Sequence, residues 1–208
     1  TPDAVVDNQG TDGVRNLGTD EAIVAFINER LSIGWEQNEV TPSAKSNDAE
    51  WIRRVFLDVV GHIPTVQQTS EFLADKSADK RARIVEVLLS DEDYVRYSTT
   101  IWTNLLIGRS NSQQVDRGAL EKFLREAFAL NRGWDEVVAD IISAEGSAEE
   151  NGASNFLLAH LNNQAVPATA ITAKLFLGQQ LQCTQCHDHP FNDSTQAEFW
   201  QFNSFFKQ

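Results

Sequence analysis

The chain has 208 residues and a mass of 23.2 kDa, and its content of 41% hydrophobic and 9% aromatic residues is typical of a folded globular protein. This composition excludes a chain that is disordered throughout. The 30 acidic residues outnumber the 17 basic ones, and the formal net charge of −13 disfavours binding to nucleic acid or to an anionic membrane surface. A basic protein or a small ligand is the expected partner.

The sequence contains no run approaching the roughly 18 consecutive apolar residues that a membrane-spanning helix needs. We therefore expect no transmembrane segment. Because the chain begins at Thr1 without the charged and apolar regions of an export signal, we expect a mature form from which a signal or an anchor has been removed. Residues 1–18 are rich in Gly, Asp and Asn and predict a flexible N-terminal arm.

Apolar residues at helical spacing follow this arm. Thr19 is a suitable N-cap for a helix that we expect to end at Gly34, with an apolar stripe of Ile23, Phe26, Ile27 and Leu31. After a polar loop, residues 47–50 (NDAE) have the form of a capping box. They predict a second helix with the apolar side Trp51, Ile52, Val55, Phe56, Val59 and Val60.

Turn and cap signals divide the next part of the chain into short helices. Gly61 suits the position after a helix end, and Thr65 with Gln68 predicts the capping box of the next helix. Ser90 and Asp93 predict the cap of a longer helix that carries Tyr94, Val95, Ile101, Trp102, Leu105 and Leu106. Residues 108–115 form a loop and a candidate boundary inside a domain that we expect to span 19–208.

The C-terminal half predicts helices around 120–128, 134–142 and 156–161. Pro167 suits the first turn of a further helix, which we expect to run to Leu181. Residues 195–198 (TQAE) predict a capping box before an aromatic helix. Since no alternating β-branched segment occurs, the predicted fold class is all-α, a single globular domain of about nine to eleven short helices.

One motif concentrates the chemistry of the chain. The segment CTQCHDHP at 183–190 holds both cysteines and two of the four histidines. A CxxCH pattern places two thiols one turn apart, where they can add to the two vinyl groups of a haem, and sets the next histidine beneath the iron. We therefore predict one haem c, bound covalently by Cys183 and Cys186, with His187 as the proximal iron ligand.

The position of this motif argues against the standard small cytochrome c fold. It lies near the end of some 180 residues of predicted helix rather than near the start. The sequence also has no Met, so the His/Met axial pair of many small cytochromes c cannot form within this chain.

The sequence resembles the planctomycete cytochrome-like domain family, a domain of unknown function. The resemblance rests on residues 51–65 (WIRRVFLDVVGHIPT), 72–75 (FLAD), 176–191 (FLGQQLQCTQCHDHPF) and Thr195-Gln196, and it covers 19–206. It implies a periplasmic, secreted or envelope-associated protein in which this domain precedes further domains. Members of the family often carry a basic residue and Trp where this chain has Asp193-Ser194. If that basic residue binds a haem propionate in the family, this chain lacks the contact.

The motif also fits two kinds of site without haem. Cys183, Cys186, His187 and His189 are all zinc ligand types, although structural zinc sites normally take ligand pairs from two separate segments. The two cysteines can also form a disulfide or stay reduced. A redox CxxC motif lacks its usual βαβ context in this helical sequence.

Several residues near the motif are candidates for the surroundings of the haem. Because His189 follows His187 by two residues, it cannot reach the opposite face of the same porphyrin, and we expect it to bond a propionate or to line the site. Asp188 can orient an imidazole, and Trp200 can wall the haem. For the distal iron ligand the candidates are His160 and His62, with His160 preferred because only a short loop separates it from the helix before the motif.

Two haem functions follow from these predictions. The first is electron transfer to a redox partner protein or to downstream domains of a longer chain. The second is a haem enzyme or a small-ligand sensor with an open sixth site. A non-haem binding or scaffold domain, with the motif as a zinc or disulfide site, is the third class.

Overall fold

Helices make up 66% of the residues that the computed structural model describes, 19–108 and 114–207, and no strand occurs among them. The ten α-helices in these ranges confirm the all-α prediction of nine to eleven helices. None of the described helices is long and apolar enough to cross a membrane. The predicted arm at 1–18 lies outside the described residues.

The chain divides into two units between Asn47 and Asp48. The described part of the first unit is helix α1 (Asp20–Gln37) and the loop after it. Thr19 caps α1 as predicted, with its hydroxyl accepting a hydrogen bond from the N–H of Ala22. Gly34 does not end the helix, because one glycine in a helix costs only about 1 kcal/mol relative to alanine and the Asn38 side chain bonds the Gly34 carbonyl. The apolar stripe stays largely exposed, with Ile23, Ile27 and Leu31 all above 40%.

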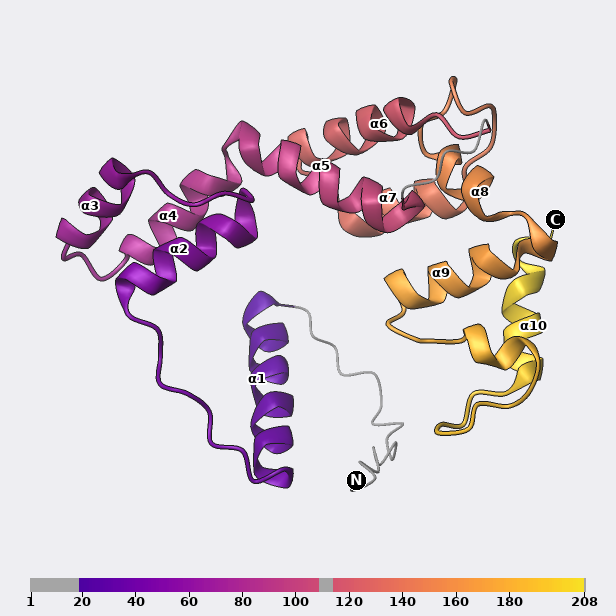
Figure 1. Ribbon diagram of the computed structural model, residues 1–208, viewed down its shortest axis with the longest axis horizontal. Coiled ribbons are helices and arrows are strands. Elements are labelled where there is room, and N and C mark those ends of the chain that lie inside the picture. The colour runs from indigo at the N-terminus through magenta and orange to yellow at the C-terminus, as the bar shows by residue number, and fades with distance from the viewer. Residues whose placement is uncertain (1–18, 109–113, 208) are drawn as a thin grey trace. The chain divides into compact units, whose positions relative to one another are not determined.

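The second unit begins with α2 (Asp48–Val59), α3 (Val66–Ala74) and α4 (Lys80–Leu89), which pack together (Figure 1). They share the buried side chains Ile52, Phe56, Val60, Phe72 and Leu88. Gly61 takes a φ of 78° directly after α2, as its predicted place at a helix end requires. The predicted capping box of α3 forms, with Thr65 and Gln68 bonded reciprocally. Local sequence signals therefore describe this region well.

Helices α5 (Glu92–Ile107), α6 (Arg117–Ala129), α7 (Trp134–Ile142) and α8 (Ser154–His160) build the largest core. Asp91 caps α5 in place of the predicted Ser90, because its carboxylate accepts from the N–H of Asp93. Residues from α5 and α6 share this core, so the helices on both sides of 108–115 pack together. Residues 109–113 of that predicted boundary lie outside the described ranges.

The C-terminal part contains the short 3₁₀ helices η1 (Asn163–Ala165) and η2 (Gln182–Gln185), and helices α9 (Val166–Phe176) and α10 (Gln196–Ser204). Pro167 lies in the first turn of α9 as predicted. The predicted continuation of this helix to Leu181 is wrong. Gly178 takes a φ of +66°, and the N–H groups of Leu177 and Gln179 both donate to the Ala173 carbonyl, so the helix ends at Phe176. The CxxCH motif therefore has a turn of its own.

Candidate functional site

The two cysteines of the motif belong to a single 3₁₀ turn. Cys183 lies in η2, and the N–H of Cys186 points to the Cys183 carbonyl at 3.5 Å. Side chains three residues apart on a 3₁₀ helix lie one above the other. Both cysteines are exposed and neither is in a disulfide. The turn thus offers two accessible thiols on one side, as attachment to two vinyl groups requires.

The residue between the thiols anchors the turn. Thr184 is 0% exposed, and its hydroxyl donates to the Leu181 carbonyl at 2.7 Å while its N–H donates to the same oxygen at 3.0 Å. Burial of Thr184 keeps the opposite side of the turn, which carries the cysteines, in solvent. No sequence signal points to Thr184, because the variable positions of a CxxCH motif carry no information of their own.

His187 has one ring nitrogen fixed by the backbone. Its Nδ1 lies 2.7 Å from the carbonyl oxygen of Asp188, and a carbonyl can only accept a hydrogen bond. The proton of the neutral ring is therefore on Nδ1, and Nε2 keeps its lone pair. The imidazole is exposed. His187 is thus held in the tautomer that binds a metal through Nε2.

His189 is held in the opposite tautomer. The N–H of Phe191 donates to its Nδ1 at 3.2 Å, so the neutral ring carries its proton on Nε2. The N–H of His189 also donates to the Ser194 carbonyl at 2.8 Å, which fixes the backbone of the loop. Two histidines two residues apart therefore present different chemistry. Nε2 of His187 is a Lewis base, and Nε2 of His189 is a hydrogen-bond donor.

Helix α10 holds the motif through hydrogen bonds to Asp188 and Gln185. The carboxylate of Asp188 accepts from the N–H of Gln196 at 2.8 Å, at the first residue of α10. The carbonyl of Gln185, inside the motif, accepts from the side chains of Gln196 and Trp200, each at 3.2 Å. Asp188 therefore orients His187 with its backbone carbonyl, while its carboxylate binds α10. The role of Gln196 could not be recognised from the sequence, because its partner is a main-chain oxygen eleven residues away.

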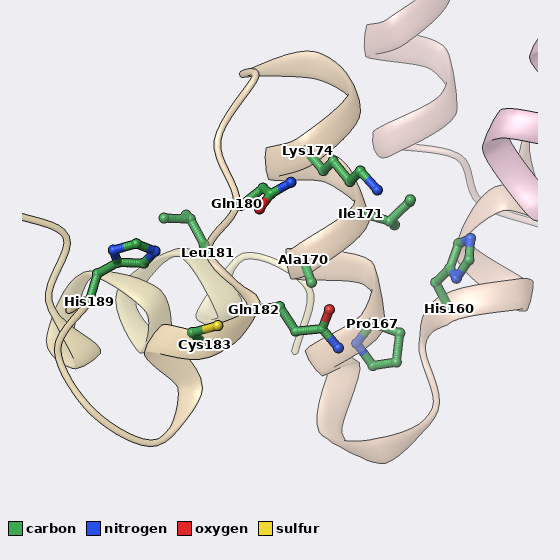
Figure 2. A pocket seen from close by; sticks show the side chains of 10 residues that line it. All are labelled: His160, Pro167, Ala170, Ile171, Lys174, Gln180, Leu181, Gln182, Cys183 and His189. Carbon is green, nitrogen blue, oxygen red and sulfur yellow. The ribbon is translucent and has the colours of Figure 1, made fainter. Parts of the chain in front are cut away.

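A pocket of about 410 Å³ lies beside the motif (Figure 2). One face of α9 forms its floor, with Pro167, Ala170, Ile171 and Lys174 at the i, i+3, i+4 and i+7 positions of a helical stripe. The remaining lining residues are His160, Gln180, Leu181, Gln182, Cys183 and His189. The lining includes neither Cys186, His187 nor Trp200. The pocket thus combines an apolar floor with polar groups at its edges.

His160 faces this pocket and His62 does not. Nε2 of His160 lies 2.7 Å from the Leu106 carbonyl, so it carries the proton and Nδ1 keeps the lone pair. His62 is bonded at both nitrogens, with Nδ1 at 3.0 Å from the Ile63 carbonyl and Nε2 at 2.9 Å from Asp93. The hydrogen bond to Ile63, together with Asp93, raises the pKa of His62. Both ring nitrogens of His62 therefore face acceptor oxygens, and His62 belongs to the contact between the α2–α3 turn and α5.

The described residues contain no group of three or more His, Cys, Asp and Glu side chains arranged to hold a metal ion. A haem iron needs fewer protein ligands than zinc does, because the porphyrin supplies four nitrogens and the chain supplies only one or two ligands. The geometry of the motif, with two thiols on one turn and one prepared imidazole, meets that smaller requirement.

The fold and the motif together define an all-helical domain with a CxxCH turn clamped against its last helix. Residues 26–208 match the family PSCyt2, described as a protein of unknown function (DUF1549), and the chain belongs to this family. No curated protein and no solved structure matches the chain.

Proposed function

We propose that the chain is a c-type haem-binding domain that transfers electrons. The observation that carries the proposal is the arrangement at 183–187, where two exposed thiols share one turn and the next imidazole has Nε2 prepared for a metal. The thiols of Cys183 and Cys186 would each form a carbon–sulfur bond to a vinyl group, with the thiol hydrogen passing to the neighbouring vinyl carbon. This addition consumes no oxidant.

The pocket beside the motif suits the mixed character of a haem. A porphyrin has an apolar ring and two carboxylates, and the pocket has the apolar side chains of Ala170, Ile171 and Leu181 next to polar groups. Nε2–H of His189 and the ammonium of Lys174 are the donors that a propionate needs. A bound haem would supply a one-electron iron couple, and these residues would hold its ring and its carboxylates.

Electron transfer accounts for the surface better than catalysis does. The net charge of −13 would steer a basic redox partner towards the domain, or the electron would pass to downstream domains of a longer chain. Phe191, two residues beyond His189, is 91% exposed and gives such a partner an apolar contact next to the motif. Covalent haem attachment fits the periplasmic or envelope location that the family resemblance implies.

The proposal is tested by producing the chain in a bacterial periplasm together with a cytochrome c maturation system. We expect an intact mass increased by one haem and a Soret absorption band that persists after denaturation. The variants Cys183→Ser and Cys186→Ser should each lose one thioether bond, and the double variant should lose covalent haem altogether. His62→Gln is the matched control, because it changes a histidine outside the pocket and should keep the haem.

A bare polypeptide mass, in cells that mature another c-type cytochrome normally, would refute haem attachment. The same sample then distinguishes a zinc site from a disulfide. Stoichiometric zinc in elemental analysis, lost in the double cysteine variant, would establish a zinc site. A mass lower by two hydrogens would establish a disulfide.

A further inference from the structure

The turn between α2 and α3 lies directly against the first turns of α5. Gly61 is so close to the ring of Tyr97 that a Cβ added to it would come within 2.2 Å of the Tyr97 Cδ2 atom. The next residue, His62, bonds Asp93 at the start of α5, 31 positions further along the chain. Its ring also meets the buried Phe56 of α2 edge to face, with the ring centroids 6.1 Å apart. His62 is therefore the polar part of a contact between two elements.

The hydrogen bonds of His62 need a proton on both ring nitrogens. Nδ1 lies 3.0 Å from the Ile63 carbonyl oxygen, and Nε2 lies 2.9 Å from the Asp93 carboxylate. A carbonyl and an ionised carboxylate can only accept, whereas a neutral imidazole has a single N–H. In either neutral tautomer, one ring nitrogen would point its lone pair at an acceptor oxygen. The imidazolium donates at both nitrogens and also forms an ion pair with Asp93, so this geometry is that of the protonated ring.

The charged side chains that act on His62 are Asp93 and Arg96, both from α5. They also pair with each other, with Nη2 of Arg96 at 2.9 Å from Asp93. The hydrogen bond to the Ile63 carbonyl, followed by the bond and the charge of Asp93, raises the pKa of His62 above its ordinary 6.5. Partial burial and the charge of Arg96 act in the opposite direction. Tyr97, the other titratable group at this contact, lies against Gly61 rather than against the imidazole.

We propose that His62 is a pH-dependent clamp, which holds the α2–α3 turn against α5 while both ring nitrogens are protonated and releases the turn when one proton is lost. The inference does not depend on the haem function, because His62 lies outside the motif and does not line the pocket beside it. Since the folded pKa is raised, the clamp is fully formed below pH 6.5 and is lost as the pH rises through the folded value. The chain therefore responds to pH near neutrality at a place away from its cysteines.

The test is a titration of the full wild-type chain by nuclear magnetic resonance, which needs no variant to fold. The His62 ring should titrate with a midpoint above 6.5. The nuclear Overhauser effect between the Gly61 Hα protons and the Tyr97 ring reports the contact itself. We expect this effect to be strong below the midpoint of His62 and to be lost above it. A midpoint at or below 6.5, or an Overhauser effect of unchanged intensity throughout the titration, would overturn the proposal.

Two variants of α5 should move the midpoint in opposite directions. Asp93→Asn removes the negative partner of the imidazolium and should lower the midpoint of His62, whereas Arg96→Gln removes a like charge and should raise it. The Overhauser effect between Gly61 and Tyr97 should follow the midpoint in each case. His62→Gln should make this effect independent of pH, because glutamine has no proton to lose in this range. A loss with rising pH that persists in His62→Gln, or a midpoint that moves the same way in both α5 variants, would refute the clamp.

Discussion

Two regions of the second unit, α5–α8 and the C-terminal part from η1 to α10, are held together by different forces. Helices α5–α8 bury a continuous apolar core in which Leu120, Leu124, Ile141 and Phe156 are all 0% exposed. The C-terminal part from η1 to α10 has a much smaller cluster, formed by Ala165, Ala168 and Phe206. Its geometry is set largely by hydrogen bonds to main-chain oxygens.

Apolar burial therefore mainly stabilises α5–α8, whereas hydrogen bonds mainly position the groups of the C-terminal part. Burial of apolar area contributes about 25 cal/mol per Å² without regard to direction. A hydrogen bond contributes only about 0.5–1.5 kcal/mol net, but it fixes where an atom lies. The hydrogen bonds from Gln196 and Trp200 to the Gln185 carbonyl therefore add little stability, but they fix the position of the motif. We therefore expect the motif region to be specified in geometry, low in local stability, and strongly stabilised by any group that binds there.

The largest expected effect contrasts the two clusters directly. Phe156→Ala empties a fully buried site in the α5–α8 core and should lower the free energy of unfolding by about 3–5 kcal/mol. Phe206→Ala acts on the small C-terminal cluster, where the residue is 9% exposed, and should cost about 2 kcal/mol. Urea unfolding followed by circular dichroism measures both. Equal losses would show that the C-terminal cluster is as important to global stability as the main core.

Structural features that depend only on residues close together in the sequence were predicted correctly. The helical class, the capping boxes of α3 and α10 and the positive φ of Gly61 follow from local signals and are confirmed. The prediction failed at α9, where the apolar run past Gly178 suggested a helix to Leu181. Apolar spacing does not show whether a helix continues once a glycine allows its carbonyls to be capped in the left-handed conformation.

The chemistry of the site was predicted only in part. The CxxCH spacing is local, and the structure shows its thiols sharing one turn as that spacing requires. The opposite tautomers of His187 and His189 depend on the backbone groups of Asp188 and Phe191, whose orientation exists only once the turn has formed. The contact of His160 with Leu106 joins residues 54 positions apart. No pattern in a single sequence reveals such a contact.

The two capping boxes provide a matched pair for a second prediction. Thr65 caps α3 and Thr195 caps α10, each with its hydroxyl accepting from the backbone N–H three residues on. Thr65→Ala and Thr195→Ala should each cost about 1 kcal/mol of stability. Only Thr195→Ala should also loosen the motif, because α10 carries Gln196 and Trp200. Hydrogen exchange by nuclear magnetic resonance should then be faster at Thr184 and Cys186 in that variant alone. Faster exchange at Thr184 and Cys186 in both variants would show that α10 does not hold the motif in position.

The smallest expected effect comes from the one chemical difference between these two boxes. The α3 box uses the neutral Gln68, whereas the α10 box uses Glu198, whose carboxylate accepts from the N–H of Thr195 at 2.7 Å. That backbone bond, followed by the bond from the Thr195 hydroxyl, holds the pKa of Glu198 below its ordinary 4.5, although nearby Asp188 acts in the opposite direction.

Because the folded pKa is lowered, the contribution of Glu198 to stability is present above pH 4.5 and is lost as the pH falls through the folded value. Mild acid should therefore loosen the start of α10 while leaving the start of α3 intact. The amide resonances of Thr195 and Thr65, followed through an acid titration, measure the two ends separately. Glu198→Gln should abolish the titration at Thr195, since a glutamine keeps an acceptor oxygen without a proton to gain. A Thr195 amide that still responds to pH in this variant would show that Glu198 is not the group responsible.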